Sequence, residues 1–387
     1  MNLGKPDLSG FMISVSRSMR SFVLTLLSFS SPYFLVSHSV SYFNVGMIIL
    51  AGSAASTIYV YVLPVLRIRI IRRVLLSWFL FSFATVTAAV TLTVAGFIFA
   101  VVAGGISLSG KDMSPNQPVE QYVIGSLFTS SREKNLHFSF YNFLSYAGNT
   151  AGALFVVLYP GVTFRLIFDV CAFLAVASVF PYMLVKFPEH STHRRGTPKL
   201  DREARSSRNR LAALFAADAF GGGFVSTSML ALWFLAVFSV PIRQSGLIFA
   251  FVNILSGISI IASGRLSMKI GTIRTMVWTH LISNIFLILM PLFHILVLSE
   301  LFLFARQATS QMDVSPRDTF VNTVFSPEVR PRTNSQFLAV RNVSTIPSPA
   351  LGGAIIQAVP DLLPFSAGII KSAYDVTLYV LFRENKI

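Results

Sequence analysis

Three aspartates stand within long apolar stretches of this sequence, where a carboxylate could carry a proton or close an ion-pair gate. Asp112 and Asp313 open two similar tetrapeptides, Asp-Met-Ser-Pro and Asp-Val-Ser-Pro, and Asp218 precedes three glycines. An ionisable group at membrane depth costs about 3 kcal/mol or more, so each is a functional candidate. For Asp112 and Asp313 we favour a gate in which they pair with Lys111, Arg317 or loop arginines. Asp218 is the better candidate for proton coupling.

Other polar residues could support a gate or meet a solute. Arg341 could neutralise an anion, but pairing with Asp313 or Asp318 is the favoured interpretation. Lys371 and Asp375 are four residues apart and can satisfy each other on one helical face, so we interpret them as structural. The residues that could line a solute cavity are Tyr141, Asn142, Asn149, Trp233, His280 and Asn284.

Enzyme motifs are absent from the sequence. The six histidines do not form His-Glu-x-x-His or another metal-binding spacing. Neither a phosphate-binding Gly-x-x-x-x-Gly-Lys-Ser/Thr loop nor Gly-x-Ser-x-Gly occurs. Cys171 is the one cysteine, so no disulfide can form within the chain. We expect no enzymatic activity, no cofactor and no bound metal, and transport would have to draw on an ion or solute gradient.

The composition is that of an integral membrane protein. Hydrophobic residues make up 53% of the 387 residues and charged residues only 12%, against roughly 25% charged in soluble domains. Ser21–Leu66 and Val74–Gly110 contain no Asp, Glu, Lys or Arg. Because a helix needs about 20 apolar residues to span a bilayer, each run predicts a hairpin of two helices.

The net charge of +15 reflects membrane topology in this interpretation, and no nucleic-acid partner is expected. Lys and Arg gather after every second predicted helix, while the intervening turns are almost bare. Since basic residues concentrate in cytoplasmic loops, we expect a multi-pass protein of the cell membrane with both termini in the cytoplasm. Arg17 and Arg20 belong to the first of these basic clusters.

Charge-free runs and turn residues predict twelve transmembrane helices in two six-helix halves. A polar, basic segment at 186–210 separates an N-terminal bundle, 1–185, from a C-terminal bundle, 211–387. The predicted helices are 20–40, 44–65, 74–92, 95–123, 136–159, 163–185, 211–238, 244–264, 275–296, 299–325, 333–357 and 363–382.

The two halves are related by an internal repeat. Asp112–Pro115 falls on Asp313–Pro316 with a displacement of 201 residues, and Arg73 falls on Arg274 with the same displacement. A membrane protein built from two similar halves is the usual architecture of a secondary transporter, with its site where the halves meet.

Four segments resemble the major facilitator superfamily, and the resemblance extends over nearly the whole chain. They are Phe215–Phe224, Thr275–His280, Ser310–Arg317 and Tyr141–Phe143. The family's loop signature after the second helix, Gly-x-x-x-Asp-Arg-x-Gly-Arg-Arg, is degraded. Its Gly, Asp and Gly positions hold Pro64, Ile68 and Ile71 here.

The resemblance implies two rocking halves that give alternating access to a central cavity. In the family, helices 1, 4, 7 and 10 line that cavity, which would place Asp112, Asp218 and Asp313 on three of them. Arg306 would lie on the tenth helix, and the sequence does not settle which way it faces. The family's inner gate uses an ion pair from the loop signature, and this chain lacks the acid for it.

We therefore expect a secondary active transporter that moves a small organic solute by alternating access. The favoured form is proton-coupled efflux of a neutral or weakly charged metabolite or drug-like compound by a monomer. One alternative is uptake of a sugar or carboxylate. An alternative of another class is a membrane-embedded solute sensor or enzyme.

Overall fold

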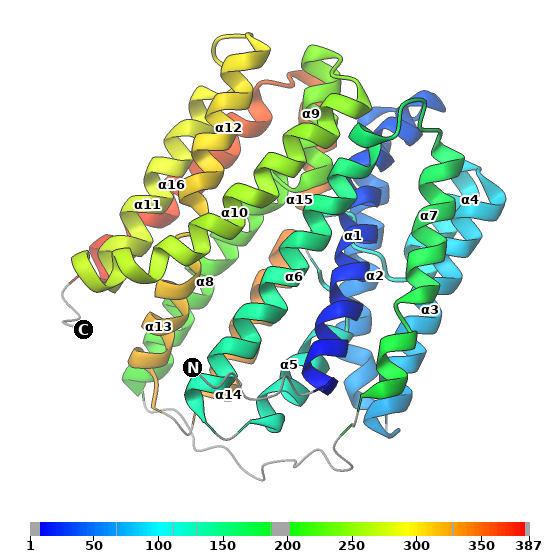
Figure 1. The fold of residues 1–387 in the computed structure, drawn as a ribbon. Coiled ribbons are helices and arrows are strands. Elements are labelled where there is room, and N and C mark those ends of the chain that lie inside the picture. The colour runs from blue at the N-terminus through cyan, green and yellow to red at the C-terminus, as the bar shows by residue number, and fades with distance from the viewer. Residues whose placement is uncertain are drawn as a thin grey trace. The chain divides into compact units, whose positions relative to one another are not determined.

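The computed structural model describes residues 8–66, 68–110, 112–128, 130–185, 187, 202–326 and 329–383, and all regular secondary structure in these ranges is helical. The predicted all-α fold is confirmed, and helices occur in order at all twelve predicted spans (Figure 1). Seven spans match one continuous α-helix: α1 (Leu8–Ser37), α2 (Tyr42–Val62, followed by the 3-10 helix η1, Leu63–Val65), α3 (Ile70–Thr91), α6 (Ser131–Leu158), α10 (Ile242–Ile270), α11 (Thr272–Leu289) and α16 (Leu362–Phe382).

The other five predicted spans are each built from two pieces. They are α4 (Val94–Ala103) with α5 (Asn116–Leu127), α7 (Phe164–Ala177) with the 3-10 helix η2 (Phe180–Leu184), α8 (Arg202–Phe224) with α9 (Thr227–Phe238), α12 (Leu296–Ser310) with α13 (Val314–Val324), and α14 (Arg330–Thr345) with α15 (Ser348–Ala358).

Six described segments are long and apolar enough to cross a membrane, when α2 is counted with η1 and α7 with η2. The α8–α9 pair, bent by 42°, makes a seventh if it is taken as one span. The remaining predicted spans are interrupted or carry polar residues along their length. Irregular backbone at membrane depth is tolerated only where it is buried in protein or lines a water-filled cavity. The broken spans therefore indicate regions of the protein interior or of a cavity.

Both repeat-related aspartates lie at helix breaks, so their predicted placement on continuous helices is wrong. Asp112 belongs to the non-helical segment between α4 and α5, and Asp313 is the N-cap residue of α13. In the first break, Gly105 and Gly110 have φ of 58° and 78°, values that side-chain-bearing residues rarely adopt. Pro316 lies in the first turn of α13, where its missing N–H costs no helical hydrogen bond.

The chain forms two compact units, which we call unit 1 and unit 2. Unit 1 comprises Met1–Thr192 with Val240–Asn253, and unit 2 comprises His193–Ser239 with Ile254–Ile387. The start of α10 thus clusters with unit 1, and the predicted division at 185 and 211 stays a prediction. Within the predicted linker, α8 begins at Arg202, so its end is helical, whereas 188–201 lie outside the described residues.

Unit 1 is organised around α1, which packs along α6. Two glycines four residues apart on α6 allow this close approach. A Cβ at Gly148 would lie 2.1 Å from the Ser18 carbonyl oxygen, and one at Gly152 would lie 2.5 Å from that of Phe22. Small residues at this spacing let transmembrane helices approach backbone to backbone.

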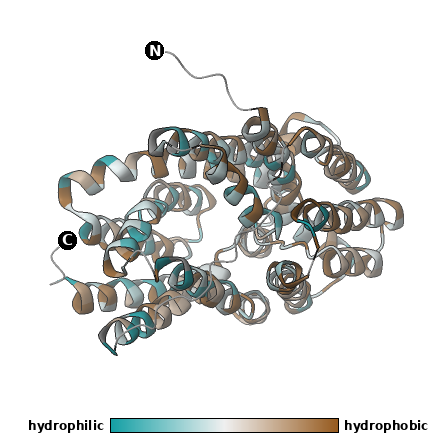
Figure 2. Cartoon of the chain, turned by 90° about the horizontal axis from the view of Figure 1, so that it is seen from below, coloured by the Kyte–Doolittle hydropathy of each residue, from teal (hydrophilic) through white to brown (hydrophobic). Residues whose placement is uncertain are grey.

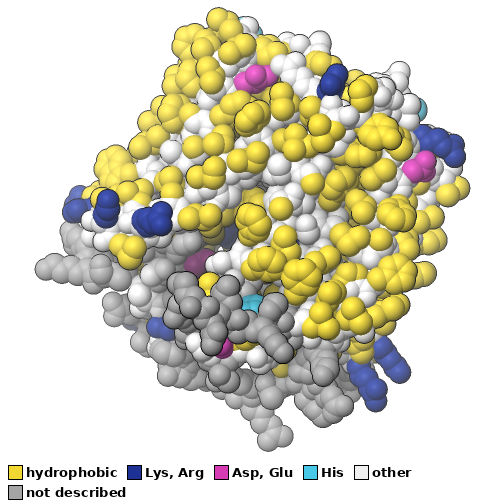
Figure 3. All heavy atoms as spheres, viewed as in Figure 1, with side chains coloured by type: hydrophobic (Ala, Val, Ile, Leu, Met, Phe, Trp, Pro, Cys, Tyr) yellow, Lys and Arg dark blue, Asp and Glu magenta, His cyan; other side chains and the backbone are white. Residues whose placement is uncertain are grey.

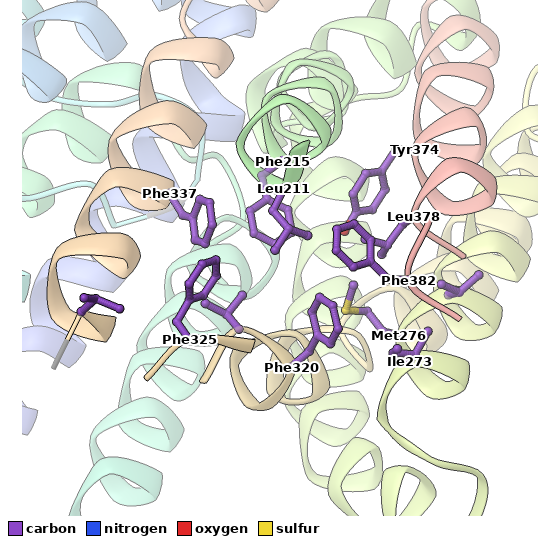
Figure 4. Close-up of a cluster of buried hydrophobic side chains, with 13 residues drawn as sticks. Leu211, Phe215, Ile273, Met276, Phe320, Phe325, Phe337, Tyr374, Leu378 and Phe382 are labelled. Carbon is purple, nitrogen blue, oxygen red and sulfur yellow. The ribbon is translucent and has the colours of Figure 1, made fainter. Parts of the chain in front are cut away.

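Unit 2 has an aromatic-rich core between α8, α11, α13, α14 and α16, which Figure 4 shows in close-up. Phe215 on α8 lies at the centre and meets Phe337 edge-on, with ring centroids 5.1 Å apart. This packing fixes the helices that carry the polar residues described below. The core residues are Leu211, Phe215, Ile273, Met276, Val277, Phe320, Val321, Phe325, Val329, Phe337, Tyr374, Leu378 and Phe382.

Large apolar side chains cover much of the outer surface. Val90 on α3 and Phe173 on α7 are 76% and 71% exposed, and Met268 on α10 is 81% exposed. Hydrophobic residues run along most helices (Figure 2) and dominate the face shown in Figure 3. A water-exposed surface rarely carries so much contiguous apolar area, so lipid is the solvent that these helices fit.

Candidate functional site

Unit 1 buries a group of charges that we call the unit 1 network: Arg17, Arg20, Asp112, Glu120, Tyr141 and Tyr182. Arg20 on α1 is 1% exposed, and two carboxylates bind it. Its Nη1 and Nη2 donate to the two oxygens of Glu120 at 2.7 and 2.9 Å. Nη2 also donates to Asp112 Oδ2 at 2.7 Å. This fork-to-fork geometry is the strong form of an arginine–carboxylate contact.

Two tyrosines complete the shell of Glu120. The Tyr141 hydroxyl donates to Glu120 Oε2 at 2.5 Å, and the Tyr182 hydroxyl donates to Oε1. The carboxylate therefore accepts bonds from α1, α6 and η2 at once. A buried anion with this many donors holds the elements around it together.

Arg17 connects the predicted residues of unit 1. Its guanidinium lies 3.8 Å from the centroid of the Tyr141 ring, donates to Asn142 Oδ1 at 3.3 Å and approaches Asp112 Oδ2 at 3.9 Å. The structure thus brings Asp112, Tyr141 and Asn142 together. Asn149 lies apart from them and accepts a bond from Thr25 on α1 at 2.9 Å.

The prediction that Arg17 lies before the first helix and Arg20 at its start, in a basic loop cluster, is wrong, and the cytoplasmic location of this end stays a prediction. Helix α1 begins at Leu8, twelve residues before the predicted start at residue 20, so both arginines lie inside it. Both are buried, with 7% and 1% exposure, because Asp112 and Glu120 supply counter-charges from other elements.

Unit 2 holds a second group, the unit 2 network: Asp218, His280, Asn284, Lys371 and Asp375. Asp218 on α8 is 4% exposed and accepts a bond from Lys371 Nζ on α16. Two further cations stand at ion-pair distance from Asp218 Oδ2, namely Arg317 Nη1 at 3.9 Å and Arg341 Nη2 at 4.0 Å. The coupling candidate is therefore ionically paired with a neighbouring helix.

His280 on α11 lies between two carboxylates. Its Nδ1 is 2.8 Å from Asp375 Oδ1 on α16, and its Nε2 is 3.8 Å from Asp218 Oδ1. Asn284, one turn along α11, donates to Asp375 Oδ2 at 2.8 Å. The predicted pair of Lys371 with Asp375 is wrong, because each reaches a partner on a different helix.

The unit 2 network lies at mid-length of its helices. His280 is eight residues from the start of α11 and nine from its end, and Lys371 is nine and eleven residues from the ends of α16. At a rise of about 1.5 Å per residue, both lie more than about 10 Å from either helix end. Such residues stand at bilayer depth, where ionisable groups are costly and mark function.

The other predicted residues of unit 2 have separate partners. Asp313 accepts a bond from Arg317 Nη1 at 2.8 Å, which confirms the predicted pair. Arg341 has Asp218 at 4.0 Å in place of the expected Asp313 or Asp318. Trp233 on α9 is fully buried, and its Nε1 donates to the Pro360 carbonyl at 3.0 Å.

The sequence analysis did not identify two residues of the unit 1 network, Glu120 and Tyr182. Glu120 is an acid inside a predicted membrane helix, and that position alone could have identified it. Tyr182 has no such signal, because its partner Glu120 lies 62 residues away along the chain. Roles of the individual residues in solute binding or coupling stay predictions.

Comparisons with known proteins address the chain as a whole. A family model described as Major Facilitator Superfamily matches residues 8–349. A curated relative, the uncharacterized membrane protein YJR124C of Saccharomyces cerevisiae, is 28% identical over 146 residues. That match covers 38% of this chain and 32% of the yeast protein, so about a third of the relative's length is spanned.

Solved structures of transporters share the fold. The human organic anion transporter MFSD10 (TETRAN) has a TM-score of 0.69 at 14% identity and covers 97% of this chain and 100% of its own. A bacterial homolog of the human lysosomal transporter Spinster, inward-facing and occupied, has a TM-score of 0.75 at 14% identity, covering 99% of both chains. The POT family transporter PepTSo has a TM-score of 0.78 at 11% identity, covering 98% of both.

At these identities the structural likeness shows the fold alone, and the family match carries the assignment. The model of the family covers most of the chain, and the solved neighbours are transporters. The described helices are those of a multi-pass membrane protein. This chain belongs to the Major Facilitator Superfamily, a family of solute transporters.

Proposed function

We propose that this chain is a proton-coupled secondary active transporter of a small organic solute. The observation that carries the proposal is the position of His280 between Asp375 and Asp218, buried at mid-length of its helix. Imidazole is the side chain whose unperturbed charge changes nearest to neutral pH. A histidine held between two carboxylates at bilayer depth is therefore suited to take up and release one proton in a transport cycle.

Protonation of His280 would change the contacts of three helices together. A cationic imidazole attracts both Asp375 on α16 and Asp218 on α8, and it competes with Lys371 for Asp218. Loss of the proton leaves Lys371 as the partner of Asp218 and loosens α11 from α8. Two arrangements of one charge network give the pair of states that alternating access requires.

We assign Asp112 and Asp313 to gating. Each is held by an arginine, Asp112 by Arg20 and Asp313 by Arg317, and neither binds a histidine. An arginine keeps its proton at any physiological pH, so it is a constant counter-charge, and each pair can open and close as an ionic gate. This division of roles leaves coupling to the unit 2 network.

Transport into proteoliposomes tests the proposal. The full chain is reconstituted, the membrane potential is clamped at zero and a gradient of one pH unit is imposed. A defined mixture of small organic solutes is then quantified inside by mass spectrometry. One pH unit stores about 1.4 kcal/mol per proton, which sustains about tenfold accumulation of a solute coupled to one proton.

At least one solute should accumulate about tenfold under the pH gradient and leave when a protonophore collapses it. Repeating the assay with the gradient in each direction also shows whether net transport is export, as we expect, or uptake. Accumulation that a protonophore leaves unchanged would reject proton coupling. Absence of flux for every solute would reject transport itself.

A further inference from the structure

The buried acids of unit 2 are matched one to one by buried bases, and one buried cation is left over among the described residues. Asp218 binds Lys371, Asp313 binds Arg317 and Asp375 binds His280. These six residues are all at least nine-tenths buried. Arg306 on α12 is equally buried, at 7% exposure, and none of the ion pairs found among the described residues includes it.

The surroundings of Arg306 position its guanidinium without an ion pair of its own, because Asp218, the carboxylate whose charge reaches it, is already bound by Lys371. Nη1 donates to Gln307 Oε1 at 2.9 Å, and Gln307 is held in turn by its own bond to Ser256 Oγ on α10 at 2.5 Å. The Nε–H of Arg306 has no acceptor among the described residues. A buried guanidinium with a neutral amide as its partner lacks the counter-charge that such groups require.

Arg306 also stands at bilayer depth. It lies ten residues from the start of α12, which corresponds to about 15 Å of helix, half the thickness of the hydrocarbon core. Solute sites of secondary transporters lie near the bilayer midplane. An uncompensated cation at this depth costs several kcal/mol and is retained where a ligand supplies the missing charge.

We propose that Arg306 binds an oxyanion of the transported solute, a carboxylate or a phosphate group. The inference rests on the proposed transport function and names its substrate class. Guanidinium groups bind such anions in a planar, two-pronged geometry, and the unoccupied Nε–H supplies one prong. The expectation of a neutral or weakly charged solute is thereby replaced by an organic anion, with Gln307 as a positioning residue.

Ligand-induced stabilisation tests this assignment without any gradient. The purified full chain is heated with benzoate, phenyl phosphate or benzamide, which share a ring and differ in the head group. Binding to the folded state raises the melting temperature, so at least one of the two anions should raise it by about 2 °C or more, and benzamide should not. Which anion acts distinguishes a carboxylate from a phosphate solute.

Three variants test whether the rise in melting temperature caused by an anion depends on Arg306. Arg306→Gln should lose the anion-induced shift, while Arg306→Lys should keep part of it because the charge remains. Arg165→Gln, at a 72% exposed position on α7, is the matched control and should respond as the wild type does. An equal shift with benzamide, no shift with either anion, or an unchanged shift in Arg306→Gln would overturn the proposal.

If Arg306→Gln does not fold, the variant Gln307→Glu tests anion binding at Arg306 instead. It places a carboxylate where Nη1 of Arg306 already donates, so it should mimic the bound anion. The unliganded Gln307→Glu protein should melt at a higher temperature than the wild type and no longer respond to benzoate or phenyl phosphate. A lower melting temperature with the anion response intact would contradict an anion site at Arg306. Anion binding without pH-driven accumulation would reject proton coupling alone.

Discussion

At the scale of single residues, the aspartates of the two repeated tetrapeptides bind different partners. Asp112 and Asp313 stand at corresponding positions of the repeat and both lie at a helix break. Asp112 reaches Arg20 on α1, whereas Asp313 reaches Arg317 one turn along its own helix. In both copies Ser-Pro lies at the start of the helix that follows the break, where proline costs no helical hydrogen bond. The choice of partner depends on which helices the fold brings near.

The unit 1 network predicts a large cost for neutralising Glu120. In Glu120→Gln, Arg20 loses one of two carboxylates while remaining buried, and both tyrosines lose an anionic acceptor. Removing one partner of a buried ion pair costs about 3 kcal/mol. Thermal unfolding of the purified chain should show a clear fall in melting temperature. Asp169→Asn, at an exposed pair with Arg165, should change stability by less than about 0.5 kcal/mol. Equal effects in the two variants would contradict a structural role of the network.

The pair of Asp218 with Lys371 predicts non-additive stability effects. Asp218→Asn leaves a buried ammonium without its closest carboxylate, and Lys371→Met leaves Asp218 without its closest cation, with Arg317 and Arg341 at 3.9 and 4.0 Å. Each single variant should lose about 3 kcal/mol. The double variant should lose less than the sum of both, because no close partner is left behind. Additive losses measured by the same unfolding assay would show that the two side chains do not interact.

At the scale of elements, close helix packing and helix breaks determine where the charges lie. The α1–α6 contact brings Arg17 and Arg20 against Tyr141 and Asn142, and the break after α4 lets Asp112 turn toward α1. Neither the helix contact nor the break can be predicted from hydropathy, which indicates only how long an apolar segment is. The sequence therefore predicted the spans but not the breaks.

The α1–α6 contact predicts that Gly152→Ala is destabilising. The added Cβ would meet the Phe22 carbonyl oxygen at 2.5 Å, so the two helices must separate, at a cost of about 1–3 kcal/mol. Gly125→Ala on α5 is the matched control, since its nearest contact would be a Phe138 carbon at 3.9 Å. There alanine should be neutral or stabilising by up to about 1 kcal/mol. Equal melting temperatures for the two variants would show that α1 and α6 are not in close contact.

At the scale of the whole molecule, the sequence predicted the architecture better than the site. Composition, charge-free runs and the repeat were enough for an all-helical membrane protein, because lipid imposes a uniform requirement on every span. The contacts of His280 with Asp375 and of Asp218 with Lys371 join residues that lie 95 and 153 positions apart. No local pattern encodes such distances, and the i, i+4 spacing of Lys371 and Asp375 favoured the wrong pair.

The central claim is that the proton which drives transport resides on His280. Substitution His280→Gln keeps a polar side chain and removes the imidazole, so pH-driven accumulation should be lost while solute exchange remains. With an imposed gradient of one pH unit, the variant should accumulate its solute to a ratio of about one, against about ten for the wild type. Exchange of internal for external solute, which needs no net proton transfer, should persist. Tenfold accumulation by His280→Gln under the same gradient would contradict the account.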